Sequence, residues 1–155
     1  MQFDIVQLGK IGIINLMSRI KAKVSEEKVL QFLQEKRDEH IGAFHFIKGG
    51  ELSQAFSFTS EGKDFIIRIN KTDESFKKDQ YASEHFASSI IPIPKIIEIS
   101  NMDADFFYCI SEKAAGNDLD SIKEGFAHTV YPQLIKIMDA IHTTKLSPGK
   151  YGWWV

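Results

Sequence analysis

The segment FIIRIN, residues 65–70, carries one arginine inside an otherwise apolar run. Successive side chains of a strand point to opposite faces, so Ile66 and Arg68 share one face. A cation on a partly desolvated face needs a counter-charge, which Asp79 on the following predicted helix can supply. Glu84 lies further round that helix and is the fallback partner. Taken alone, Arg68 also fits a surface arginine whose stem covers apolar neighbours.

The segment GGELSQAF, residues 49–56, is a candidate phosphate-binding loop. Glycine lets the backbone approach a ligand closely, and successive N–H groups with the Ser53 hydroxyl can face phosphate oxygens. A Gly-Gly turn between two strands needs no ligand, so the plain-turn interpretation stays open. The loop also differs from the glycine-spaced loop of protein kinases.

The elements that must position these residues follow from the hydrophobic pattern. A helix is predicted from the N-cap Ser25 to about Arg37. Five strand-like runs come after it, with a helix inserted after the third and ended by Pro92 and Pro94, which cannot continue a helix. The runs are FHFIK, QAFSFTS, KDFIIRIN, KIIEIS and DFFYCIS. This order predicts an α+β fold, an antiparallel five-stranded sheet with one inserted helix.

The two ends of the chain have a different character. Residues 1–24 fit neither a clean helical nor a clean strand period, and we interpret them as an N-terminal extension. After Glu112 comes a loop containing Gly116. The segment HTVYPQLIKIMDAIHTTKL then places apolar residues at helical spacing. A helix-led second region is therefore expected from about Asp118.

The composition limits which kinds of binding partner can be expected. The 155 residues have a formal net charge of −2, which gives no electrostatic reason to expect nucleic acid or an anionic membrane as a partner. No apolar run approaches the roughly 18 to 20 residues needed to cross a bilayer. The single cysteine, Cys109, lies in the apolar run FFYCI, where a thiol behaves as a small hydrophobe. We therefore expect a cytoplasmic location.

Four segments together resemble the aminoglycoside phosphotransferase family, most closely its hygromycin B phosphotransferase branch. They are GGELSQAFSF, FIIRIN, FKKDQYASEHFASSIIPIPKIIEI and FYCISEKAAGNDL. The resemblance runs from about Ser25 to about Gly152. It implies a protein-kinase-like N-lobe over residues 25–110, then a hinge and the first helices of a truncated C-lobe over 111–155. The chain would be the N-terminal part of such an enzyme.

The resemblance also implies roles for individual residues, with ATP as the cofactor. Arg68 would contact the ATP phosphates, and Asp79 would orient it. The backbone of the glycine loop would cover the triphosphate, Ile66 would pack on the base, and Ile110 would border the back of the pocket. Hinge residues would read the adenine edge through their main chain. The loop residues are Gly50, Ser53, Gln54 and Ala55, and the hinge residues are Ser111, Glu112 and Lys113.

Phosphoryl transfer also needs an aspartate at the acceptor hydroxyl, and an asparagine and a second aspartate for magnesium. The family takes the first from a His-x-Asp loop, and none of the five histidines here is followed by Asp two residues on. The aspartates of DAD, residues 103–105, and DLD, residues 118–120, are typical of turns rather than of metal ligands. We therefore assign no catalytic or metal residue, and expect Mg²⁺ only in a complete enzyme.

Three functions stay open at this point. A complete enzyme would transfer the ATP γ-phosphate to a hydroxyl of an antibiotic such as hygromycin B, while this chain alone would show no turnover. An inactive remnant of the fold would bind nucleotide or a protein partner, with self-association through an exposed lobe interface. The same architecture also serves other small hydroxylated acceptors.

Overall fold

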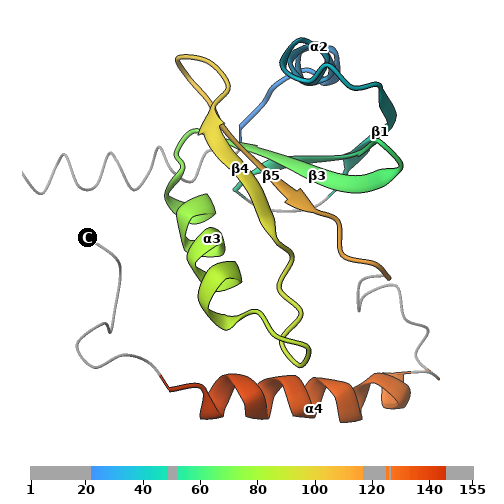
Figure 1. Cartoon of the computed structure of the whole chain (residues 1–155), viewed down its shortest axis with the longest axis vertical. Helices are drawn as coiled ribbons and strands as arrows, with labels where there is room; N and C mark the ends of the chain where they lie inside the picture. Colours follow the sequence, from blue (N-terminus) through green and yellow to red (C-terminus); the bar gives the residue numbers. More distant parts are fainter. Residues whose placement is uncertain (1–21, 49–51, 117–124, 126, 146–155) are drawn as a thin grey trace, which may run out of the picture.

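The structure is a computed structural model that describes residues 22–48, 52–116, 125 and 127–145. A five-stranded antiparallel sheet lies between α2 and α3, and α4 lies apart from it at the bottom of Figure 1. Every predicted helix and strand is present. The elements are α2 (Glu26–Lys36), β1 (Ile41–Ile47), β2 (Gln54–Ser60), β3 (Lys63–Asn70), α3 (Glu74–Phe86), β4 (Ile96–Asn101), β5 (Phe107–Glu112) and α4 (Ala127–Thr143).

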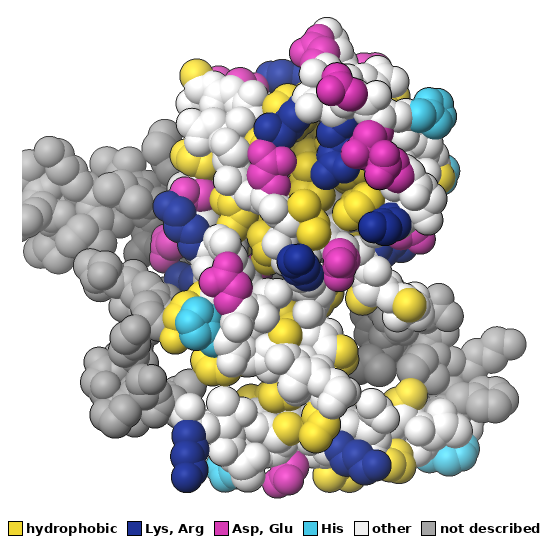
Figure 2. All heavy atoms as spheres, in the orientation of Figure 1, with side chains coloured by type: hydrophobic (Ala, Val, Ile, Leu, Met, Phe, Trp, Pro, Cys, Tyr) yellow, Lys and Arg dark blue, Asp and Glu magenta, His cyan; other side chains and the backbone are white. Residues whose placement is uncertain are grey.

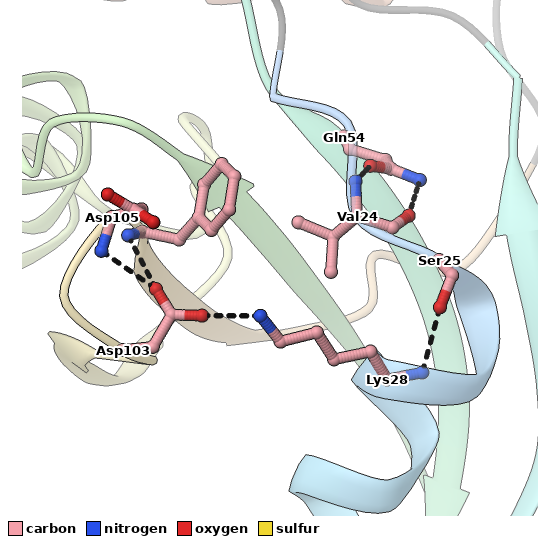
Figure 3. A network of polar contacts seen from close by, with 7 residues as sticks. Val24, Ser25, Lys28, Gln54, Asp103 and Asp105 are labelled. Carbon is pink, nitrogen blue, oxygen red and sulfur yellow. Dashed lines mark hydrogen bonds and ion pairs between the residues drawn. The ribbon is translucent and has the colours of Figure 1, made fainter.

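The N-terminus of α2 is capped as its sequence predicts. The Ser25 hydroxyl accepts a hydrogen bond from the Lys28 backbone N–H at 3.2 Å, which satisfies one of the unpaired donors of the first turn. Lys28 also forms an ion pair with Asp103 at 2.6 Å, in the turn between β4 and β5 (Figure 3). Just before the helix, Val24 exchanges two backbone hydrogen bonds with the Gln54 side chain.

A second polar contact fastens the other end of α2 to the edge of the sheet. Lys36 lies 2.9 Å from Glu98 of β4, and Glu98 also accepts a hydrogen bond from the Tyr108 hydroxyl. Burial favours the neutral form of Glu98, but the hydrogen bonds from Tyr108 and Lys36, together with the charges of Lys36 and Arg37, hold its pKa below the ordinary value of 4.5. Glu98 therefore stabilises the fold as an anion.

The strand order is β1-β2-β3-β5-β4, so β5 lies between β3 and β4. The β2–β3 hairpin turns at Glu61 and Gly62, which both have positive φ (50° and 74°). Such a turn matches the twist of the two strands it joins. On the other side of β3, Arg68 pairs with Cys109 of β5. This register brings Arg68 beside a strand that comes much later in the chain.

The sheet has two different faces. The face toward α2 carries the hydrophobic core, and the register places the side chains of Phe56, Ile67 and Ile110 there. Ala22 and Val24, on the N-terminal side of α2, pack into the same core. The opposite face carries Arg68 and is the one that α3 approaches. The full core is Ala22, Val24, Val29, Leu33, Ile41, Phe56, Phe58, Ile67, Ile69, Tyr108 and Ile110.

Helix α3 ends earlier than expected. The proline pattern predicts an end just before Pro92, but the helix stops at Phe86, and Ala87 is already extended (φ −61°, ψ 133°). The Ser88 hydroxyl accepts hydrogen bonds from the backbone N–H groups of Ile90 and Ile91, at 3.3 and 3.0 Å. A serine side chain that bonds nearby backbone competes with helix continuation. The predicted boundary was therefore wrong.

Helix α4 leaves most of its apolar side chains in solvent. Ile135 and Met138 are 65% and 62% exposed, and hydrophobic side chains are visible along this helix in Figure 2. An apolar cavity of about 420 Å³ separates the end of α4 from the segment after α3, lined by Phe86, Ile91, Ile93, Ile141, His142 and Thr144. Among the described residues, no helix is long and apolar enough to span a bilayer.

Candidate functional site

The predicted ion pair between Arg68 and Asp79 is present. Arg68 Nη1 donates to Asp79 Oδ2 at 2.6 Å, which joins β3 to α3. The two side chains are 28% and 44% exposed, so the pair is partly desolvated but reachable from solvent. The fallback partner Glu84 instead accepts a hydrogen bond from Gln80 on its own helix. Glu84 does not pair with Arg68 because it points in a different direction from Asp79 on α3, as the helical period predicts.

Two more residues complete the surroundings of the guanidinium. Phe76 is fully buried, and its ring centre lies 5.3 Å from Arg68 Cζ, a distance suited to a cation–π contact. Cys109 Sγ accepts a hydrogen bond from Arg68 Nη2 at 3.6 Å. Burial is the largest single effect and disfavours the charge on Arg68, but the hydrogen bonds and charge interactions with Asp79 and Cys109 together raise the arginine pKa. Burial also raises the pKa of the Cys109 thiol, although Arg68 opposes that shift.

The residues around Arg68 on the same face are small. Ala55 and Cys109 flank Arg68, and Ser57 and Ser111 flank Ile66, each from the neighbouring strands. Ile66 is half-buried, and its partners on both neighbouring strands are serines. The face therefore combines the Arg68 guanidinium with a shallow apolar surface beside it, which suits a flat, anionic ligand. Sequence reasoning missed Ser57 as a member of this group and gave Cys109 no part in it.

Two predicted site residues point to the other face. Ile110 is fully buried in the core beside Ile67, so its side chain does not share the Arg68 face. The Gln54 amide is occupied by the Val24 backbone, with contacts of 2.8 and 2.9 Å. Ala55 does lie on the Arg68 face, and Ser53 is half-buried just before β2. Gly50 lies outside the described residues.

Two of the predicted hinge residues use their backbone N–H groups for hydrogen bonds within the chain. Ser111 and Glu112 belong to β5, and the Glu112 N–H donates to the Lys95 carbonyl at 3.0 Å. The Lys113 N–H donates to the Asp64 carbonyl at 3.1 Å. Neither donor is available to a ligand in this arrangement.

Asp103 of the DAD turn has a structural role. Asp103 Oδ1 accepts from the backbone N–H groups of Asp105 and Phe106, and its Oδ2 accepts from Lys28. The hydrogen bond from Lys28 is the largest of the effects that lower the Asp103 pKa. Within the described part of the chain, no group of three His, Cys, Asp or Glu residues is placed to hold a metal ion. Asp118 and Asp120 lie outside it.

Comparison with known proteins relates this arrangement to one family. Hygromycin-B 4-O-kinase of Escherichia coli is 35% identical over 127 residues, which are 82% of this chain and 37% of that protein. The crystal structure of aminoglycoside phosphotransferase APH(4)-Ia matches with a TM-score of 0.74 at 35% identity, over 79% of this chain and 41% of that one. The chain is a relative of the aminoglycoside phosphotransferases.

A thermostable mutant of APH(4)-Ia, in a ternary complex with AMP-PNP and hygromycin B, matches with a TM-score of 0.71 at 34% identity. That match covers 76% of this chain and 40% of the other. The expected α+β, kinase-like architecture is confirmed by these structures. The chain spans less than half the length of the relatives it matches. No protein-family model matches it.

Proposed function

We propose that this chain is the nucleotide-binding part of an ATP-dependent aminoglycoside phosphotransferase. The carrying observation is the Arg68–Asp79 ion pair at 2.6 Å, on the sheet face that α2 leaves uncovered. Phosphoryl transfer depends on positioning and on neutralising phosphate charge, and a strand cation held by a helix carboxylate does both in kinase-type enzymes. The relationship to hygromycin-B 4-O-kinase supports the aminoglycoside as acceptor.

In this proposal ATP lies along the Arg68 face. The guanidinium binds the phosphates, and the base packs on Ile66 between the short side chains of Ser57 and Ser111. The loop before β2, including Ser53, covers the triphosphate. Main-chain groups after β5 read the base edge. The described residues fit the nucleotide, but they hold no set of ligands for Mg²⁺, so we derive no step through the metal.

The proposed division of the chain follows from this assignment. Residues 25–110 form the nucleotide-binding lobe, 111–155 the hinge and the start of a helical lobe, and 1–24 an extension. The complete protein would transfer the γ-phosphate to a hydroxyl of an aminoglycoside such as hygromycin B. A cytoplasmic location is part of the proposal, supported by the single buried thiol, Cys109.

Calorimetric titration of the 155-residue chain with ATP tests the proposal. We expect Arg68→Met to weaken ATP binding by about tenfold to a hundredfold, because a charge-assisted hydrogen bond to phosphate is worth roughly 1.5–3 kcal/mol. Adenosine affinity should not change. Arg37→Met is the matched control, since Arg37 is also partly buried and packs over the rings of Phe58 and Phe65, but on the α2 side. Equal effects of the two substitutions would refute the site.

A kinase assay examines the second part of the proposal. The sequence contains no His-x-Asp motif, so we expect the chain alone to bind nucleotide without phosphorylating hygromycin B. Turnover clearly above that of the Arg68→Met variant would show that catalytic residues exist which we have not assigned.

A second candidate function is a non-catalytic module that associates with a second copy of itself. The favouring observation is the apolar surface of α4, where Leu134, Ile135 and Met138 are all exposed. Exposed apolar patches of this kind commonly mark interfaces. Sedimentation at several concentrations tests this function. A monomer at all concentrations would exclude it, and a dimer that Ile135→Glu dissociates would support it.

A further inference from the structure

The guanidinium of Arg68 is held from three directions. Nη1 donates to Asp79 at 2.6 Å, Nη2 donates to the Cys109 sulfur at 3.6 Å, and the Phe76 ring lies 5.3 Å from Cζ. Asp79 and Phe76 come from α3, whereas Cys109 comes from β5. Contacts from two elements to different parts of one planar group fix both its position and its orientation.

The two nitrogen atoms have partners of very different strength. The carboxylate of Asp79 forms a charge-assisted hydrogen bond, roughly twice as strong as a neutral one. A thiol sulfur is only a weak acceptor. Burial raises the pKa of Cys109 and so keeps it in this weakly accepting form. Nη1 is therefore strongly bonded to Asp79. Nη2 can exchange its weak hydrogen bond to the thiol for one to a stronger acceptor at little cost in free energy.

The Arg68 side chain is partly open to solvent on the sheet surface. Arg68 pairs across the sheet with Ala55 on one side and Cys109 on the other, and both have short side chains. The Arg68 side chain keeps 28% of its surface exposed although Phe76 is buried beneath it. A phosphate oxygen can thus approach the guanidinium without displacing a bulky neighbour.

We propose that Arg68 divides its donors between fold and ligand: Nη1 stays with Asp79, and Nη2 leaves the Cys109 thiol to bind a phosphate oxygen. Cys109 and Phe76 are positioning residues that keep the guanidinium aimed at the site without competing with the nucleotide. The inference rests on the proposed nucleotide site. It adds that Nη2 is the nitrogen that binds the phosphate, and that the Cys109 thiol is the partner from which Nη2 is released.

The S–H stretching band of the protein tests this exchange directly, because Cys109 is the only cysteine in the sequence. Raman spectra of the unmodified chain are recorded alone, with saturating adenosine and with saturating ATP. The Arg68→Met variant gives the band position of a thiol without a guanidinium partner. We expect ATP to shift the band toward that position, adenosine to leave it unchanged, and ATP to have no effect on the variant.

The outcomes separate this inference from the proposed function. If calorimetry shows that ATP binds but the S–H band does not move, the exchange is wrong and the nucleotide site stands. If ATP does not bind at all, both are wrong. A band that moves equally with adenosine and ATP would refute the phosphate as its cause.

A substitution of Phe76 gives a second measurement. Phe76→Leu removes the ring but keeps an apolar side chain beneath Arg68. We expect it to weaken ATP binding by roughly threefold to tenfold, the range of a partly desolvated cation–π contact, with adenosine affinity unchanged. Equal losses for adenosine and ATP would mean that Phe76 only supports the fold. The Raman test needs no variant of Phe76, so it still decides the exchange if this substitution unfolds the protein.

Discussion

The ion pair between Arg68 and Asp79 should be measurably stronger than an exposed pair on the same helix. Exposed pairs contribute about 0.2–1 kcal/mol, and hydrogen bonds to charged groups about 1.5–3 kcal/mol. Arg68 is 28% exposed and Asp79 is 44% exposed. Solvent screening therefore makes this pair weaker than the range for hydrogen bonds to charged groups. We therefore expect a coupling free energy of about 1 kcal/mol.

A double-mutant cycle with Arg68→Met and Asp79→Asn measures this coupling through urea unfolding. With a typical dependence on urea, a coupling of about 1 kcal/mol makes the midpoint shift of the double variant differ by roughly 0.5 M from the sum of the two single shifts. The control cycle uses Lys77→Met and Asp73→Asn, whose ion pair joins the N-cap of α3 to its first turn at 2.6 Å, with Lys77 66% and Asp73 29% exposed. That pair should give about 0.3–0.5 kcal/mol. A coupling for Arg68 no larger than the control would refute the claim that the Arg68 face is desolvated.

Three further predictions concern the core, the edge of the sheet and the base surface. Leu33→Ala should lower the free energy of unfolding by about 2–5 kcal/mol in thermal or urea melts, because Leu33 is fully buried and the substitution leaves a cavity. The lowered pKa of Glu98 stabilises the fold above pH 4.5, and this contribution is lost as the pH falls through the lower folded-state value, so Glu98→Gln should lose less stability than the unmodified chain in acid melts. Ser57→Leu should place a bulky side chain beside Ile66 and weaken adenosine and ATP binding equally in titrations. A loss confined to ATP would contradict the proposal that the base packs on Ile66.

Much of the fold could be predicted because its signals are local. The Ser25 cap, the strand periods and the Glu61–Gly62 turn each depend on a few consecutive residues. The Arg68–Asp79 contact was also predictable, because strand alternation points Arg68 away from the apolar side chains of its strand and kinase-type sites pair such a cation with a carboxylate of the following helix. The end of α3 was not, because the Ser88 hydroxyl competes with the helix before the prolines do.

By itself, the sequence determined the order of helices and strands, from the periodicity of short segments, and it indicated the charged pair of Arg68 and Asp79. Only the tertiary structure decided which face each side chain of β5 occupies. Both alternations of FFYCI, residues 106–110, are apolar, so the period does not distinguish Cys109 from Ile110. Pairing of β5 with β3, between residues 41 positions apart, placed the thiol against Arg68 and Ile110 in the core. A shift of one residue in that register would exchange the two faces, and that register depends on the packing of the whole sheet.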